Sequence, residues 1–190
     1  MNSKYKIVLS SHSPRRRELL SGLDVDFTIR VIQDIDETYP GDLAVAEIPQ
    51  YLSRKKAEAY LPTLADDELL ITADTVVVVG DEVLGKPSCR DEAVAMLHQL
   101  SNRSHQVITG VSLTTRTKQR SFNVTTHVTF KELTDDEIAY YVDKYQPFDK
   151  AGAYGIQEWI GYIGVTSLEG SYFNVMGLPV QRIYTELQNF

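Results

Sequence analysis

The chain has 190 residues, of which 43% are hydrophobic and 24% charged, as is typical of one soluble globular domain with a substantial core. The formal net charge of −7 argues against non-specific attraction to nucleic acid, and no apolar run approaches the roughly 20 residues that span a bilayer. The first residues lack the long apolar stretch of a signal peptide, and the single cysteine, Cys89, favours a reducing compartment. We therefore expect one cytoplasmic domain over residues 1–190, with no nucleic-acid or membrane partner.

The first half of the chain alternates predicted strands with predicted helices. Ser13 is suited to be the N-cap of the first helix, and Pro14 is suited to its first helical position. The segment LLITADTVVVVG is rich in β-branched residues and apolar on both faces, which is typical of a central strand. The predicted elements are a strand at 5–10, a helix from Pro14 to about 23, a strand at 27–32, a polar loop at 33–42, a helix at about 43–61 and the central strand at 69–80.

The second half predicts antiparallel pairing as well as helices. Gly80-Asp81 predicts a tight turn, and Thr134 followed by an acidic first turn predicts a helix start. The mixture indicates an α/β (α+β mixed) fold and not a doubly wound parallel sheet. The predicted elements are a strand at 82–84, a helix at 91–100, a hairpin of strands at about 107–115 and 122–130, a helix at 134–145 and a last helix from about Val175.

Three arginines occupy the first turn of the helix predicted after Ser13. The helix dipole already places partial positive charge there, so Arg15, Arg16 and Arg17 are unfavourable unless an anion sits beside them. A helix start that follows a strand offers free N–H groups to phosphate, and the Ser11 hydroxyl and the guanidinium groups would add donors. A solvated arginine cluster with ordinary helix capping is the alternative.

Asp74 interrupts the apolar central strand. A carboxylate in such a strand is costly unless it is paired, bound to metal or placed at a cavity. It could hold Mg²⁺ or deprotonate an attacking water, whereas the structural alternative is an aspartate bonded to nearby backbone amides. Because side chains alternate along a strand, Asp74 and Thr75 would serve one site only at a strand end or a bulge.

Two lysines and an acidic pair are weaker candidates. Lys56 lies four residues beyond Leu52 and borders the apolar side of its helix, which snorkelling alone would explain. Lys86 lies in the turn LGKP, where it either points into a cleft or is simply exposed to solvent. Asp36 and Glu37 could coordinate Mg²⁺ from their loop, although most such pairs are solvated.

The common catalytic and cofactor motifs are missing from the sequence. The four histidines show no metal-ligand spacing, and there is no Cys-x-x-Cys pair, nucleophile elbow, Walker A loop or dinucleotide fingerprint. The usual kinase, GTPase and dehydrogenase classes are therefore not expected.

Five segments together resemble the Maf family of nucleotide pyrophosphatases: SSHSPRRRELL, the ADT of ITADTVVVV, LGKP, DKAGAYGIQ and GSYFNVMGLPV. They follow the family order and span nearly the whole chain. The resemblance implies the fold of inosine triphosphate pyrophosphatases, an elongated mixed sheet flanked by helices, with two lobes around a cleft. It also implies a homodimer.

The resemblance implies a hydrolase that cuts nucleoside triphosphates between the α and β phosphates, releasing a monophosphate and pyrophosphate. The implied substrates are dTTP and UTP, or modified pyrimidine triphosphates that a house-cleaning enzyme would remove, and the implied cofactor is a divalent cation, Mg²⁺ or Mn²⁺. The implied roles are Asp74 as catalytic proton acceptor, Asp74 and Glu37 at the metal, Ser11, Arg15, Arg16, Lys56 and Lys86 at the phosphates, and Arg15, Thr75 and Gln157 in substrate specificity.

Three other functions compete with this hypothesis. The family is also associated with inhibition of septum formation, so a nucleotide-binding regulator without hydrolysis is the first alternative. A phosphatase or sugar-nucleotide enzyme with the same phosphate cradle is the second, and orthophosphate as the product would reveal a phosphatase. An inactive interaction domain is the third, and the complete motif set argues against it.

Overall fold

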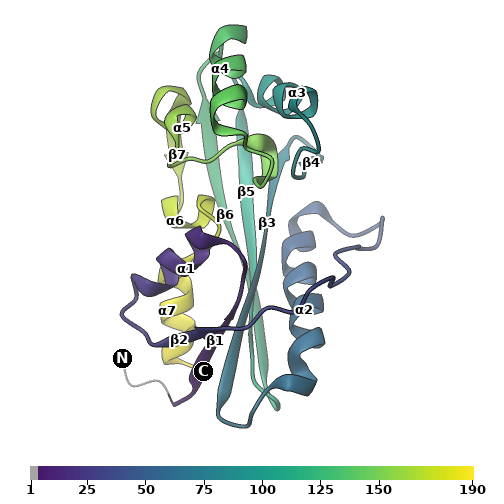
Figure 1. Ribbon diagram of the computed structural model, residues 1–190, viewed down its shortest axis with the longest axis vertical. Coiled ribbons are helices and arrows are strands. Elements are labelled where there is room, and N and C mark those ends of the chain that lie inside the picture. The colour runs from purple at the N-terminus through teal and green to yellow at the C-terminus, as the bar shows by residue number, and fades with distance from the viewer. Residues whose placement is uncertain (1–3) are drawn as a thin grey trace. The chain divides into compact units, whose positions relative to one another are not determined.

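The computed structural model describes residues 4–190, which form a seven-stranded mixed sheet flanked by helices (Figure 1). The strands are β1 (Lys6–Ser10), β2 (Phe27–Ile29), β3 (Glu68–Val79), β4 (Glu82–Leu84), β5 (Ser104–Thr114), β6 (Gln119–Phe130) and β7 (Val165–Glu169). The α-helices are α1 (Pro14–Ser21), α2 (Ile48–Tyr60), α3 (Arg90–Leu100), α4 (Asp135–Tyr145), α5 (Trp159–Gly164), α6 (Tyr172–Val175) and α7 (Val180–Gln188). Short 3-10 turns cover Val45–Glu47, Leu61–Thr63 and Ala151–Ala153.

The sheet has the order β2-β1-β3-β5-β6-β7, with β4 paired to β3. Strand β1 is parallel to β2 and β3, whereas β4 is antiparallel to β3 and β7 is antiparallel to β6. Strand β3 therefore lies between β1 and β5, and its residues from Leu69 to Ala73 are buried. The predicted mixed sheet and the predicted central strand are both confirmed.

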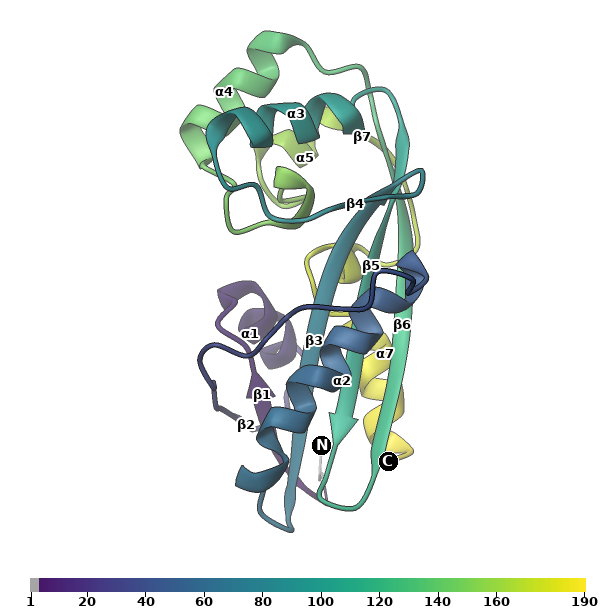
Figure 2. The ribbon, with the colours of Figure 1, turned by 90° about the vertical axis from the view of Figure 1, so that its right-hand side faces the viewer.

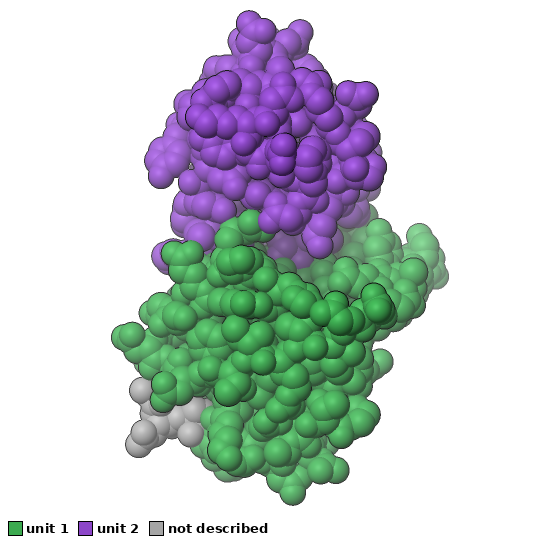
Figure 3. Space-filling view, viewed as in Figure 1, with its two compact units in different colours: residues 1–74, 109–124, 177–190 green, residues 75–108, 125–176 purple. Residues whose placement is uncertain are grey.

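The chain divides into two compact units, which are coloured separately in Figure 3. Unit 1 comprises residues 1–74, 109–124 and 177–190, and unit 2 comprises residues 75–108 and 125–176. The two lobes of the sequence hypothesis have a counterpart in these units. The cleft between lobes and the single domain over 1–190 stay predictions.

In unit 1, helices α2 and α7 lie on opposite faces of the strands (Figures 1 and 2). Helix α2 approaches β5 so closely that a Cβ atom added at Gly110 would lie 2.2 Å from the backbone of Pro49 and Gln50. A glycine is therefore required at this position, since any other residue would push the helix away from the sheet. Ala57 and Tyr60 of α2 join Val8, Leu64 and Leu70 in a buried apolar cluster.

Unit 2 has its own hydrophobic core beneath α3 and α4. The buried side chains of this core come from the strands, from both helices and from the segment that follows α4. They include Val77, Val79, Leu97, Leu100, Phe130, Ile138, Tyr141, Val142, Tyr154 and Ile160. Each unit thus has enough buried apolar surface to form a core, as expected for compact structures.

The local start signals in the sequence act as predicted. The Ser13 hydroxyl accepts the backbone N–H of Arg16 at the start of α1, where Pro14 fills the first turn. Thr134 and Glu137 form a capping box at the start of α4, with each side chain accepting the other's backbone N–H. Gly80, with φ of 60°, turns β3 into β4.

Two predicted helices are wrong in extent. The helix predicted over 43–61 begins only at Ile48, after the 3-10 turn, and Pro49 lies in its first turn, where a missing N–H is harmless. The last helix does not run on from Val175, because Gly177 has a φ of 112° and Pro179 precedes a new helix, α7. The strand predicted to reach residue 32 ends at Ile29, and α5 and β7 were not predicted.

One histidine, His105, is buried in unit 2. His105 is 2% exposed, lies edge-on to Phe130 and Tyr154, and shares a 2.7 Å hydrogen bond with the Tyr154 hydroxyl through Nε2. Its Nδ1 atom is buried without a hydrogen-bond partner. Burial lowers the pKa of His105 from 6.5 to about 4, so the ring is neutral in the folded protein at neutral pH.

We expect the free energy of unfolding to fall by about 2 kcal/mol between pH 7 and pH 5 because of His105 alone. Between pH 6.5 and 4 the unfolded chain binds a proton at His105 that the folded chain excludes. The contribution of neutral His105 to the free energy of unfolding is therefore complete above pH 6.5 and is lost as the pH falls toward 4. Urea unfolding of the native protein and of His105→Gln at both pH values measures this contribution. Equal pH dependence of the two proteins would show that His105 does not cause it.

Candidate active site

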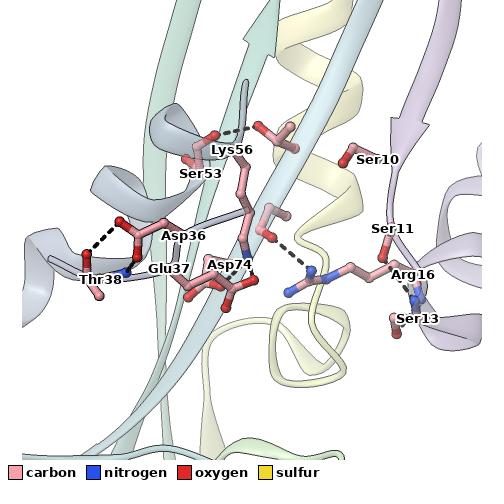
Figure 4. Close-up of polar contacts among 12 residues, drawn as sticks. Ser10, Ser11, Ser13, Arg16, Asp36, Glu37, Thr38, Ser53, Lys56 and Asp74 are labelled. Atoms are coloured by element: carbon pink, nitrogen blue, oxygen red, sulfur yellow. Dashed lines mark hydrogen bonds and ion pairs between the residues drawn. The ribbon is translucent and has the colours of Figure 1, made fainter. Parts of the chain in front are cut away.

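Three predicted site residues meet in unit 1 around one ammonium group (Figure 4). The Lys56 Nζ atom lies 2.6 Å from Oδ1 of Asp74 and 3.0 Å from Oε1 of Glu37. The side chains of Lys56 and Asp74 are 15% and 13% exposed, whereas that of Glu37 is 53% exposed. Little water therefore screens the Lys56–Asp74 pair, and Glu37 completes it from the solvent side.

Hydrogen bonds between α2 and β3 place Lys56 opposite Asp74. Thr72 and Asp74 are two residues apart on β3 and point to the same face, while Ser53 and Lys56 are three apart on α2 and share one side. The Thr72 hydroxyl donates to the Ser53 carbonyl at 2.7 Å, and the Ser53 hydroxyl bonds that of Ser112 on β5 at 2.8 Å. The side chain of Lys56 thus leaves the helix directly over Asp74.

The loop between β2 and α2 brings Glu37 to this pair. Lys55 donates to Asp36 at 2.7 Å and to the Thr38 carbonyl at 2.8 Å, and Asp36 accepts the Thr38 N–H at 2.9 Å. The hydrogen bonds from Lys55 and Thr38 lower the pKa of Asp36 to about 2, so this carboxylate stays charged at neutral pH. Of the two acidic residues considered in the sequence, Asp36 stabilises the loop through its bonds to Lys55 and Thr38, and Glu37 contacts Lys56.

Arg16 connects the start of α1 with the strand that carries Asp74. Its Nε donates to the Gly177 carbonyl at 2.7 Å, and its Nη1 donates to the Ala73 carbonyl at 2.8 Å. Burial lowers the pKa of Arg16, while the charges of Asp74 and Glu37 raise it and that of Arg15 lowers it. The guanidinium group remains charged and adds a third cation, with Lys56 and Arg15, to this part of unit 1.

Ser11 and Arg15 lie at the same end of α1. Ser11 is buried, its hydroxyl accepts the Ser13 N–H at 3.1 Å, and its carbonyl accepts two bonds from Arg17 at 3.2 and 3.3 Å. Arg15 is half-buried in the first turn, and its charge acts on Arg16. The three predicted arginines therefore do not share one role, because the Arg17 guanidinium group is bonded to the Ser11 carbonyl.

The other three predicted residues belong to unit 2. Thr75 follows Asp74 within β3, which continues to Val79, so Asp74 does not lie at a strand end. Lys86 is exposed and Gln157 is half-buried. A hydrogen bond of 3.0 Å from the Gly152 N–H to the Gly85 carbonyl joins the turn that carries Lys86 to the loop that carries Gln157.

The carboxylates of Asp74 and Glu37 suit a divalent cation. Both already contact one positive group, the Lys56 ammonium, so their oxygens converge on a cation in this structure. Mg²⁺ is commonly held by one or two carboxylates, with substrate phosphates and water as the other ligands. Among residues 4–190, no cluster of three or more His, Cys, Asp or Glu side chains has a metal-binding arrangement.

Several residues that build this site carry no signal in the sequence. The carbonyls of Ala73 and Gly177 that accept from Arg16 are backbone groups, which any residue would supply. Thr72 and Ser53 are ordinary in a strand and a helix. Only their spacing, two residues before Asp74 and three before Lys56, indicates in retrospect that they share a face with the charged pair.

The seven-stranded sheet and the helices that flank it define a mixed α/β fold. A similar fold occurs in a HAM1 protein from Coxiella burnetii, with a TM-score of 0.51 and 16% sequence identity over 98% of this chain and 100% of that one. This likeness confirms the predicted fold class. Within residues 4–190, no helix has both the length and the apolar character needed to cross a membrane.

Comparison of the sequence identifies the family. The family model described as "Maf-like protein" matches residues 6–190, and the chain belongs to the Maf family. A dTTP/UTP pyrophosphatase of Parabacteroides distasonis is 64% identical over 98% of this chain and 97% of its own. A dTTP/UTP pyrophosphatase of Bacteroides thetaiotaomicron is 60% identical over 97% of this chain and 96% of its own. The resemblance that the five sequence segments indicated is confirmed.

Proposed function

We propose that this protein hydrolyses dTTP and UTP to the nucleoside monophosphate and pyrophosphate. The observation that carries the proposal is the half-buried Asp74 carboxylate, 2.6 Å from the Lys56 ammonium and within the electrostatic reach of Arg16. The two relatives named dTTP/UTP pyrophosphatase, which match nearly the whole chain, support the choice of substrate.

In the proposed reaction, a water molecule attacks the α-phosphorus. The bond from that phosphorus to the α–β bridging oxygen breaks, pyrophosphate leaves, and the water oxygen stays on the monophosphate. Asp74 accepts the proton of the water and later releases it to solvent. The phosphates compete with Asp74 for Lys56, so substrate binding frees the carboxylate oxygen that now accepts from the lysine.

The cationic residues stabilise the pyrophosphate leaving group. Negative charge develops on the bridging oxygen as the bond breaks, and fixed cations in a partly desolvated site lower the energy of that state. Arg16 is already oriented by two backbone carbonyls, so little ordering is required when the phosphates bind. We assign this role to Arg15, Arg16, Lys56 and Lys86, with Ser11 as a hydrogen-bond donor.

Asp74 and Glu37 would hold the divalent cation, Mg²⁺ or Mn²⁺. When bound, such a cation neutralises phosphate charge and lowers the pKa of a bound water. Lys56 would then turn from the carboxylates to the phosphates. Because Glu37 is more exposed than Asp74, we expect it to contribute to metal affinity more than to proton transfer.

Arg15, Thr75 and Gln157 are the proposed specificity residues. The Gln157 side-chain amide can both donate to and accept from the edge of a pyrimidine. The hydrogen bond between Gly152 and Gly85 supports a common task for Gln157 and Lys86, since it joins their two segments. Non-standard pyrimidine triphosphates present similar edges and are proposed as further substrates.

Replacing Lys86 with alanine is expected to lower kcat/KM for dTTP about tenfold or more, because one charge-assisted contact to phosphate is worth roughly 1.5–3 kcal/mol. Steady-state kinetics of pyrophosphate release measures the effect. The matched control is Lys144→Ala, which removes another exposed lysine of unit 2, one that donates to Tyr140. An unchanged kcat together with an unchanged KM in Lys86→Ala would place Lys86 outside the site.

A nucleotide panel with Mg²⁺ or Mn²⁺, with pyrophosphate and orthophosphate followed separately, tests the proposed function. We expect pyrophosphate from dTTP and UTP. Pyrophosphate mainly from purine triphosphates would overturn the specificity assignment, and orthophosphate would indicate a phosphatase. Binding without any product would favour a nucleotide-sensing regulator of cell division.

We also propose that the protein acts in the cytoplasm as a homodimer. Cys89, the only cysteine in the sequence, supports a reducing compartment. Sedimentation velocity of the purified protein tests the dimer, and a single monomer boundary at micromolar concentration would contradict it.

A further inference from the structure

The loop that carries Gln157, residues 150–158, has an ion pair between its first and last residues. Lys150 at the start of the loop contacts Glu158 at its end, with Nζ and Oε1 3.1 Å apart, and also contacts Asp149 at 2.7 Å. The whole Lys150 residue is 8% exposed. A lysine is rarely buried to this degree unless it is paired, so the pair with Glu158 is part of the loop's structure.

Tyr141 of α4 holds the same loop through two hydrogen bonds. Its side chain is fully buried, its hydroxyl donates to Oε2 of Glu158, and the same hydroxyl accepts the N–H of Gly155 at 3.0 Å. Burial and the bond to Glu158 raise the pKa of Tyr141, so the hydroxyl keeps its proton at neutral pH and can donate. The Tyr141 hydroxyl thus bonds the backbone of Gly155, before Gln157, and the side chain of Glu158, after it.

At Gly155 a side chain would collide with the residues that make these contacts. A Cβ atom added at Gly155 would lie 2.9 Å from Cδ of Glu158 and 3.1 Å from Cε of Lys150. The Glu158 N–H also donates to the Gly155 carbonyl at 3.0 Å, which closes the short turn containing Gln157. Residues 155–158 are therefore held at both ends, and Gln157 is the half-buried residue within the turn whose side chain takes no part in these contacts.

We propose that Tyr141, Lys150 and Glu158 are positioning residues that hold Gln157 in place and thereby set the preference for the nucleobase. The inference rests on the proposed function, because it needs Gln157 to meet the base. Discrimination by an amide depends on hydrogen-bond length and angle, and these bonds weaken steeply when their geometry is distorted. Loosening the turn should thus weaken selection among bases more than it weakens hydrolysis.

Tyr141→Phe is the test variant, because it keeps the buried ring and removes only the hydroxyl. We expect the ratio of kcat/KM for UTP over CTP to fall about tenfold, mainly through a higher KM for UTP, and to fall at least as far in Gln157→Ala. Lys150→Met should act in the same direction, and Lys150→Arg, which keeps the charge, should retain more of the ratio. The control is Tyr145→Phe, whose ring stacks on Tyr141 at 5.1 Å and which should leave the ratio unchanged.

The ratio separates positioning from a general structural role. Partial unfolding lowers the rate with both nucleotides equally and leaves the ratio as it was. If Tyr141→Phe keeps the UTP/CTP ratio of the native protein while Gln157→Ala lowers it, the inference is overturned and the proposed function stands. If the native protein hydrolyses neither nucleotide, the proposed function fails. Selection among bases is then measured by the ratio of the UTP and CTP dissociation constants. Equal affinities of the native protein for UTP and CTP would overturn the inference as well.

Discussion

Replacing Asp74 with asparagine is expected to lower kcat for dTTP hydrolysis by roughly 10²–10⁴-fold, the usual contribution of a positioned general base. Asparagine keeps the volume of aspartate but cannot accept a proton from water, and it loses the charge that pairs with Lys56 at 2.6 Å. The fold should persist, because asparagine keeps the shape of aspartate and its side-chain carbonyl can still accept a hydrogen bond from Lys56. Pyrophosphate release under saturating substrate measures the change, with circular dichroism as a check on folding.

The matched control is Asp67→Asn. Asp67 also accepts from a lysine, Lys6, at 2.7 Å in unit 1, but its side chain is 55% exposed. We expect this variant to keep its native kcat. A folded Asp74→Asn protein that turns over dTTP within about threefold of the native rate would remove Asp74 from the role of proton acceptor.

Replacing Gly110 with alanine is expected to lower the free energy of unfolding by roughly 3 kcal/mol, at the upper end of what overpacking costs. The added Cβ would lie 2.2 Å from backbone atoms of Pro49 and Gln50, and a backbone cannot move aside as the end of a side chain can. Helix α2 would have to shift, and Lys56 would move with it. A lower kcat in the protein that remains folded should therefore accompany the loss of stability.

Urea unfolding of Gly110→Ala and of a control, Gly41→Ala, measures the effect. A Cβ at Gly41 would meet nothing within 4 Å, so we expect that variant to stay within about 0.5 kcal/mol of the native protein. A loss below about 1 kcal/mol at Gly110 would contradict the close contact between α2 and β5.

The local features of the fold were predictable where one residue decides the backbone. Ser13 with Pro14, Thr134 with Glu137, and Gly80 each set a helix start or a turn through bonds to nearby residues. The division of the last helix at Gly177 was missed because glycine tolerates both helical and non-helical backbone, and only its φ of 112° in the folded chain reveals the break. The short β7 depends on tertiary pairing with β6.

The chemistry of the site was easier to predict than its geometry. Asp74 is conspicuous because a carboxylate is costly in an apolar strand, but its contact partner Lys56 lies 18 residues away in the sequence, on another element. Lys56 taken alone was better explained by snorkelling. The bond from Thr72 to Ser53 that aligns the pair depends on how α2 packs on the sheet, which no local pattern encodes. A common site for these residues and for Lys86 and Gln157 stays a prediction.

The most direct test of the central claim is hydrolysis of dTTP in water enriched in ¹⁸O, with both products analysed by mass spectrometry. Attack at the α-phosphorus leaves the water oxygen on the nucleoside monophosphate, so we expect the label in dTMP and none in pyrophosphate. Label in pyrophosphate, with unlabelled dTMP, would place the attack at the β-phosphorus and contradict the proposed roles of Asp74 and of the cations around the leaving group.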